Sequence, residues 1–210
     1  VPVVDITTGL YAAIGILMAL SERQRSGLGQ FLETTLYETG LAVMHPHAAN
    51  YFMHGKPPGL TGNEHPNLVP YAIFPTKTDN IFIGVGNDGT FRKLVKEVGK
   101  PELGTDPRFA RNKDRIANRD ALRAELAAVF SQHEAEPLCN RLLAAGLPAG
   151  PVQKIDQALT NPHTLHRGDI LEKDWYKGVA SSIRLERTKP SLRRTPPKFS
   201  QHTSEVLGEF

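Results

Sequence analysis

The sequence predicts an α/β protein in two parts, on three observations. A long uncharged segment near the N-terminus has the periodicity of a helix. The middle of the chain alternates predicted strands and helices. Segments rich in proline and glycine, His54–Pro58 and Gly146–Pro151, separate this middle from both ends. We therefore expect three kinds of segment: parts of a larger α/β domain at 1–45 and 146–210, a linker at 46–64, and a smaller α+β domain at 65–145.

Length and composition are those of an ordinary globular protein. The 210 residues are 40% hydrophobic and 22% charged, which allows a real apolar core. The formal net charge is +3, and Lys and Arg are mostly interspersed with Asp and Glu, so we expect no nucleic-acid partner. The single cysteine, Cys139, is predicted to be a packed thiol beside Leu138 and Leu142. A lone cysteine favours a reducing compartment, and we expect a cytoplasmic location.

The first twenty residues are predicted to form a core helix. Leu10, Ile14 and Leu17 recur at helical spacing, and no charge interrupts the segment from Ile6 to Leu20. Because Ala and Gly fill the other faces, we expect burial on most sides. The segment is predicted to be too short for a bilayer, which needs about 20 apolar residues, and no basic region precedes it as in a signal peptide. No membrane contact is expected.

One carboxylate, Asp5, lies at or just before the first turn of this helix. Unpaired backbone N–H groups and the helix dipole favour negative charge at that place. Two roles are open: Asp5 caps the helix, or it acts as a nucleophile. Spacing alone favours the cap, because a capping Asp is far commoner than a catalytic one.

The segments up to residue 70 are predicted as turn, strand, helix and loop. Gly27 and Gly29 form a turn, because a phosphate-binding loop would follow a strand and open a helix, which is the reverse of the order here. Residues 31–37, FLETTLY, are predicted to form a strand. Residues 37–58 are predicted to begin as a helix, which ends in a segment rich in proline and glycine. The loop at 59–70 has the length of a functional loop.

The middle and the end of the chain carry clearer signals. A hairpin is predicted at 71–85 around Thr78, Asp79 and Asn80. A helix follows that is capped by Asn87 or Asp88, closed by Gly99, and apolar on one face at Phe91, Leu94, Val95 and Val98. The remaining predicted elements are helices at 114–132, 134–146, 155–162 and 202–210, and a hairpin at 169–186 with its turn at Lys177-Gly178.

Several common chemical signatures are absent or weak. The sequence has no G-x-S-x-G segment and no P-loop. The histidine pairs His45/His47 and His163/His166 lack metal-site spacing, so we expect no metal. The basic run near the C-terminus has no interleaved aromatic residues and is predicted to be a solvated surface; it comprises Arg184, Arg187, Lys189, Arg193, Arg194 and Lys198.

The order of several short motifs resembles the family III CoA-transferases, the carnitine-dehydratase and bile-acid-inducible type. These motifs are VVDITTGLYAAIGILMAL, R-x-x-S-G-L-G-Q, GNEHPNLVPY, GND, DPRF, GLPAGPV and PPKFSQHTSEVLGE. Together they run along the whole chain and match about the C-terminal half of a typical member. The resemblance implies part of a Rossmann-like large domain plus a small α+β domain. It also implies two partners, an N-terminal half of the same protein and a second copy in an interlaced homodimer.

The resemblance assigns a catalytic role to Asp5. In the family, the Asp of a D-x-x-x-G segment is the nucleophile, and the segment falls on Asp5 and Gly9. The implied reaction moves coenzyme A from an acyl-CoA thioester to a free carboxylic acid through an aspartyl anhydride and an aspartyl-CoA thioester. Coenzyme A and acyl-CoA are then substrates, and no permanently bound cofactor is implied.

Two features depart from the family pattern. The loop Gly62, Asn63, Glu64 and His65 lies where many transferases carry a glycine-rich loop that closes over the intermediate, but only one of these four residues is glycine. We expect a substrate-binding loop over the active site, with an ordinary interdomain turn as the alternative. Ser200 and Gln201 stand where Gly and Glu are usual, and no catalytic role is expected there.

Two other functions remain open on the sequence. An α-methylacyl-CoA racemase of the same family would use the Asp as an acid or base at an α-carbon. A non-catalytic interaction domain would keep the fold without the activity.

Overall fold

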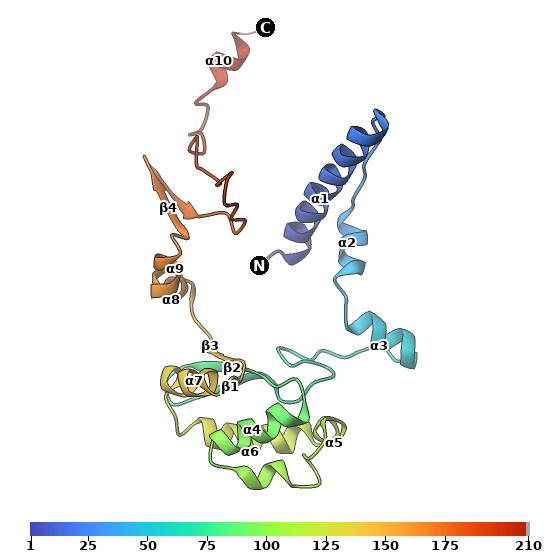
Figure 1. The fold of residues 1–210 in the computed structure, drawn as a ribbon, viewed down its shortest axis with the longest axis vertical. Coiled ribbons are helices and arrows are strands. Elements are labelled where there is room, and N and C mark those ends of the chain that lie inside the picture. The colour runs from blue at the N-terminus through green and yellow to red at the C-terminus, as the bar shows by residue number, and fades with distance from the viewer. Residues whose placement is uncertain (209–210) are drawn as a thin grey trace.

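In the computed structural model, which describes residues 1–208, two arms extend from one packed central unit (Figure 1). The N-terminal arm (residues 1–60) contains α1 (Val3–Ser26), α2 (Leu36–Ala42) and α3 (His47–His54). The C-terminal arm (residues 152–208) contains α8 (Ile155–Thr160), α9 (Pro162–His166), β4 (Ile170–Lys173), β5 (Tyr176–Val179) and α10 (Thr203–Leu207). Residues 209 and 210, the end of the last predicted helix, lie outside the described residues.

The central unit (residues 69–151) is a small antiparallel sheet covered by helices. The sheet has the order β1-β2-β3, formed by β1 (Tyr71–Pro75), β2 (Asn80–Gly84) and β3 (Ala149–Pro151). Its helices are α4 (Asp88–Glu97), η1 (Pro101–Gly104), α5 (Asn112–Ala117), α6 (Arg119–Phe130) and α7 (Ala135–Ala144). The mixture of helices and strands confirms the predicted α/β class.

The buried core lies entirely within the central unit. Among the described residues, every buried hydrophobic side chain falls between Val69 and Leu147. Phe74 of β1 meets Phe130 of α6 edge to face, with ring centroids 5.2 Å apart. The apolar face predicted for α4 is confirmed, since all four of its predicted inward residues are buried.

The predicted cap of α4 is also confirmed, with Asn87 as the capping residue. Its Oδ1 accepts from the Thr90 N–H at 2.9 Å, and the Thr90 hydroxyl accepts from the Asn87 N–H at 3.1 Å. Gly99 follows with φ 76°, a conformation that glycine adopts without strain.

The strand predicted at residues 31–37 is wrong. Residues 31–35 form no regular structure, and α2 begins at Leu36. The reason is local: the Thr35 hydroxyl accepts from the Glu38 N–H at 3.2 Å, a capping interaction that starts a helix. The helix expected from residue 37 is divided into α2 and α3 because Pro46, at the start of α3, cannot donate within a helix.

Two other boundaries differ from the predictions. The helix expected at 114–132 is interrupted at Asn118, whose side-chain amide donates to the Asp114 carbonyl at 2.9 Å and so competes with the backbone. The late hairpin turns at Asp174 and Trp175 rather than at Lys177-Gly178. Asp174 takes φ 53°, a left-handed conformation that Asp tolerates, and Gly178 lies within β5.

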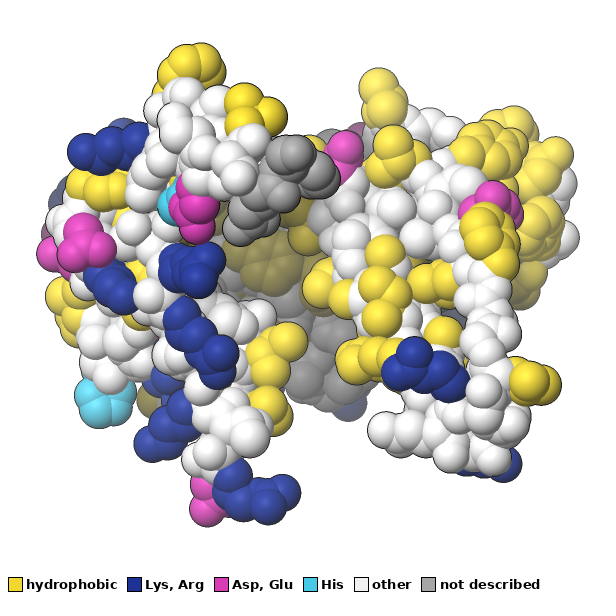
Figure 2. Space-filling model, turned by 90° about the horizontal axis from the view of Figure 1, so that it is seen from above, with side chains coloured by type: hydrophobic (Ala, Val, Ile, Leu, Met, Phe, Trp, Pro, Cys, Tyr) yellow, Lys and Arg dark blue, Asp and Glu magenta, His cyan; other side chains and the backbone are white. Residues whose placement is uncertain are grey.

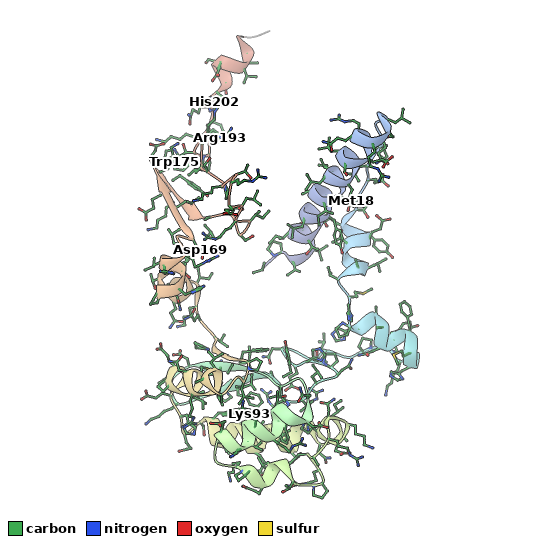
Figure 3. All side chains as sticks on the ribbon, in the orientation of Figure 1. Met18, Lys93, Asp169, Trp175, Arg193 and His202 are labelled. Atoms are coloured by element: carbon green, nitrogen blue, oxygen red, sulfur yellow. The ribbon has the colours of Figure 1, made fainter. Side chains whose placement is uncertain are left out.

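The expectation that α1 is buried on most sides is wrong for the chain described. None of its residues is buried: Leu17 is 66% exposed, and Met18, which Figure 3 labels, is 67% exposed. One side of the helix does pack within the arm: a side chain at Gly15 would meet Leu32 Cδ1 at 2.7 Å. The other faces have no neighbour among the described residues that buries them.

The predicted length of this helix was also too short. The folded helix has 24 residues because Val3, Val4 and Asp5 precede the uncharged segment and residues 21–26 continue it. By length and composition α1 could cross a membrane, which removes the basis on which the sequence argued against that.

The two arms differ in surface chemistry. Hydrophobic side chains gather over the half of the molecule formed by α1, α2 and α3, whereas Lys and Arg side chains follow the C-terminal arm (Figure 2).

Candidate functional site

Asp5 lies in the first turn of α1, with an exposed side chain. The helix N-cap is Pro2, and no side-chain hydrogen bond caps this end. The first hydrogen bond of the helical pattern runs from the Ile6 N–H to the Pro2 carbonyl at 3.1 Å, so the amides that precede Ile6 point out of the N-terminus. The structure thus gives Asp5 no capping hydrogen bond, and it leaves the carboxylate beside the positive end of the helix dipole.

The loop that contains the four candidate substrate-binding residues is fastened to the central unit. Glu64 accepts from two arginines of α6, with Arg119 Nη1 3.0 Å from Oε2 and Arg123 Nη1 2.5 Å from Oε1. Asn63 Oδ1 accepts from the Ile73 N–H of β1 at 3.2 Å. The Glu64 carboxylate is therefore occupied by two cations, with one arginine on each oxygen.

His65 is held by both its backbone and its ring. Its N–H donates to the Tyr71 carbonyl at 3.0 Å, and its Nδ1 accepts from the Asn67 N–H at 3.0 Å. The ring meets Tyr71 edge to face at 5.2 Å. Burial, followed by the charges of Arg119 and His47, lowers the pKa of His65. Its neutral form is thus favoured, which suits an Nδ1 that accepts a hydrogen bond.

Arg115 is a buried polar centre that the sequence analysis missed. Its side chain is fully buried and stacks on the Phe91 ring at 4.5 Å. It donates to the Val69 carbonyl at 2.6 Å, the Phe109 carbonyl at 2.9 Å and Asp88 Oδ1 at 2.8 Å. Burial lowers the pKa of Arg115, and the hydrogen bond to Asp88 opposes that shift. These contacts give the GND and DPRF segments a structural role.

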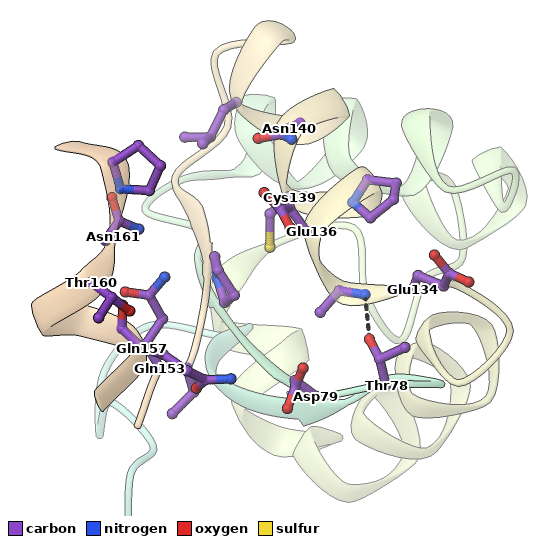
Figure 4. A pocket seen from close by; sticks show the side chains of 16 residues that line it. Thr78, Asp79, Glu134, Glu136, Cys139, Asn140, Gln153, Gln157, Thr160 and Asn161 are labelled. Atoms are coloured by element: carbon purple, nitrogen blue, oxygen red, sulfur yellow. Dashed lines mark hydrogen bonds between the residues drawn. The ribbon is translucent and has the colours of Figure 1, made fainter. Parts of the chain in front are cut away.

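A hollow lies elsewhere, between α7 and the start of the C-terminal arm (Figure 4). It encloses about 940 Å³. Its labelled carboxylates are Asp79, Glu134 and Glu136, and the side-chain amides that line it are Asn140, Gln153, Gln157 and Asn161. Cys139 also borders it, but burial raises the pKa of this thiol to about 11, so it is not a ready nucleophile. Asp5 and residues 62–65 do not line this hollow.

Asp5 and the loop come from different parts of the chain. The N-terminal end of α1 is the end nearer the central unit (Figure 1). No hydrogen bond or ion pair between Asp5 and residues 62–65 is present within residues 1–208. In the same range, no group of three or more His, Cys, Asp or Glu side chains is arranged to hold a metal ion.

Comparison with known proteins gives the class. Residues 1–203 match CoA-transferase family III, so the chain belongs to this family. The succinate–glutarate CoA-transferase of Agrobacterium fabrum is 33% identical over 100% of this chain and 54% of its own length. The acetyl-CoA:oxalate CoA-transferase of Acetobacter aceti is 30% identical over 98% of this chain and 53% of its own length. The chain thus spans about half the length of the curated relatives it matches.

Solved structures agree on the fold. A CAIB/BAIF family protein from Brucella suis superposes with a TM-score of 0.79 at 35% identity, over 100% of this chain and 55% of that protein. The human succinyl-CoA:glutarate CoA-transferase, compared by sequence, is 30% identical over 100% of this chain and 49% of its own length. The family and fold implied by the order of motifs are confirmed.

Proposed function

We propose that the protein transfers coenzyme A from an acyl-CoA thioester to a free carboxylic acid, with Asp5 as the nucleophile. The observation that carries the proposal is the place of Asp5: it is exposed, without a capping hydrogen bond, in the first turn of a helix of a family III CoA-transferase. A nucleophilic carboxylate must be ionised and accessible, and the positive end of the helix dipole favours the anion.

The chemistry then has four acyl transfers. An Asp5 oxygen attacks the thioester carbonyl, and the CoA thiolate leaves a mixed anhydride behind. The thiolate attacks the Asp5 carbonyl, which releases the donor acid and leaves an aspartyl-CoA thioester. The acceptor carboxylate attacks that thioester and expels the thiolate. The thiolate then attacks the acceptor carbonyl, which forms the new acyl-CoA and frees Asp5, so no redox partner is needed.

Trapping of the intermediate tests the proposal. The protein is mixed with succinyl-CoA and glutarate, the compounds in the name of the human relative, or with acetyl-CoA and oxalate, those in the name of the Acetobacter aceti relative. Quenching with hydroxylamine should give a hydroxamate at Asp5, detected by mass spectrometry. A racemase would exchange an α-proton and give no adduct, and a non-catalytic domain would do neither.

Substitution of the nucleophile is the second test of the proposal. Asp5→Asn should abolish transfer with little change in stability, because Asn is nearly the same size and the carboxylate makes no cap that would be lost. Asp174→Asn, in the turn of the late hairpin, is the matched control, because Asn tolerates the same left-handed backbone. Turnover well above a small fraction of wild type in Asp5→Asn, with deamidation excluded, would contradict the proposal.

We also propose that α1 is covered in the active protein by protein rather than by lipid. Large apolar side chains such as Leu10, Ile14 and Leu17 are more than half exposed on this helix, and such a surface marks an interface. The other half of the family's chain and a second copy are the proposed cover, so that Asp5 faces a cleft. Light scattering should show a dimer when the missing half is supplied. A stable monomer that binds and turns over acyl-CoA alone would refute this.

A further inference from the structure

We propose that Arg119 and Arg123 of α6 are positioning residues that fix the loop at residues 62–67 as a rigid wall, so that it does not open and close as a free lid. The functional part of this inference rests on the proposed CoA transfer, because it takes the loop to face the reacting carboxylate. The structural part stands on contacts within the described chain.

The two arginines bind different parts of the structure in addition to Glu64. Beyond its bond to Glu64, Arg119 donates to the His65 carbonyl with both Nη atoms, at 3.2 Å each, and to the Pro66 carbonyl at 3.1 Å. Arg123 donates to the Ile73 carbonyl at 3.2 Å and stacks on Phe74 at 5.3 Å. One guanidinium thus holds the loop backbone, and the other ties the same carboxylate to the sheet.

The ion pair between Glu64 and Arg119 is partly shielded from water, whereas the Arg123 side chain is 40% exposed. The Glu64 and Arg119 side chains are only 20% and 24% exposed. The space enclosed by Glu64, Arg119, Arg123 and β1 is about 10 Å³, at the lower limit for one water molecule. Partly buried ion pairs with several hydrogen bonds hold their geometry better than exposed pairs, which contribute little.

The charge of the loop surface matters for a reacting site beside it. A free Glu64 carboxylate close to the nucleophile would repel both the nucleophile and a carboxylate substrate. Arg119 and Arg123 bind this carboxylate against the central unit, and the lowered pKa of His65 favours its neutral form. Gly62 has φ 61° and open space where a side chain would stand, and we take its backbone to be the part of the loop that faces the reacting site. An uncharged backbone wall can exclude water from an anhydride without competing with the carboxylates.

Hydrogen exchange tests the anchoring itself, without any substrate. In Arg119→Gln, the amides of residues 61–67 should exchange at least about tenfold faster than in wild type, because the change expected from loss of even one of the four charge-assisted hydrogen bonds of Arg119 is about that large. Exchange in β1 and β2 should stay unchanged. Arg111→Gln is the control, because its ion pair with Asp114 is exposed and touches no part of the loop. Unchanged exchange at 61–67 would overturn the proposal.

The functional test measures how acyl-CoA is partitioned between transfer and hydrolysis in the complete protein. A loosened wall should admit water, so Arg119→Gln should raise the ratio of hydrolysis to transfer several-fold, whereas Arg119→Lys should restore part of it. An unchanged ratio beside accelerated exchange would overturn the wall and leave a purely structural clamp. If wild type shows no transfer and no hydroxamate at Asp5, the proposed function fails, and the exchange experiment alone decides the clamp.

Discussion

The central unit and the N-terminal arm each contain a helix with large apolar side chains, but only the helix of the central unit buries them. In α6, Leu122, Leu126 and Phe130 are fully buried, whereas in α1 Leu17 and Ile14 remain more than half exposed. The difference is not hydrophobicity but partners, because a helix becomes part of a core only where other elements cover its apolar face. The central unit supplies that cover from its own 83 or so residues of chain. Among the described residues, no element of the arm buries the apolar side chains of α1.

The largest effect should come from the buried arginine. Arg115→Met removes the partner of Asp88 and of two carbonyl groups, and breaking such a buried network should cost about 3–5 kcal/mol. Urea unfolding of the 210-residue chain, followed by circular dichroism, measures this cost. Arg111→Met, whose side chain is 69% exposed, should change stability by less than about 0.5 kcal/mol. Equal effects of the two substitutions would contradict the assigned network.

A matched pair of leucines tests the comparison directly. Leu126→Ala should destabilise the chain by about 2–5 kcal/mol because it leaves a cavity in the core. Leu17→Ala, on a residue that is 66% exposed, should stay within about 0.5 kcal/mol in this chain. The same Leu17→Ala should become costly in the complete protein if α1 is covered there. A large cost for Leu17→Ala in the 210-residue chain alone would break the comparison.

Two helix caps test the same comparison between the central unit and the N-terminal arm with smaller expected effects. Asn87→Ala removes the capping box of α4 and should cost about 1 kcal/mol of global stability. Thr35→Ala removes the cap of α2 in the arm and should lower only local helicity. Thermal unfolding reports the first, and amide exchange across residues 36–42 reports the second. A global shift from Thr35→Ala would mean that the arm unfolds together with the central unit.

The smallest expected effect is a pH dependence at the junction of loop and central unit. The pKa of His65 is lowered in the folded state, so its contribution to stability is present above pH 6.5 and is lost as pH falls below that value. Its ring meets Tyr71, and the charges of Arg119 and His47 oppose its protonation. His65→Gln should flatten the stability profile below pH 6.5. A profile that is unchanged by the substitution would contradict this assignment.

The sequence predicted the fold of the central unit well because its signals are local. The hairpin at 71–85 and the Asn87 cap follow from turn residues and side-chain hydrogen bonds between near neighbours. Failures arose where two local signals compete: Thr35 and Glu38 start a helix inside a β-prone stretch, and Asn118 interrupts a periodic one.

The candidate site was only partly accessible to such reasoning. Asp5 was found through the resemblance and stays a prediction, since its spacing alone favours a cap that the structure does not show. Apart from the Phe109 carbonyl, six residues from Arg115, the hydrogen-bond partners of Arg115, Arg119 and Arg123 lie 27 to 59 residues away along the chain, and periodicity cannot identify them. Their one signal in the sequence was a cluster of arginines on predicted helices, a pattern that surface helices share.

The single thiol of the chain has a practical consequence. Cys139 is 1% exposed, and its pKa of about 11 keeps it protonated at neutral pH, so alkylating reagents should pass it by while the central unit is folded. A cysteine introduced at Met18 would then be the only reactive one, with no need to remove the native residue first. The labelling rate of this cysteine would fall when the proposed assembly covers α1, so it would report the time at which that step occurs.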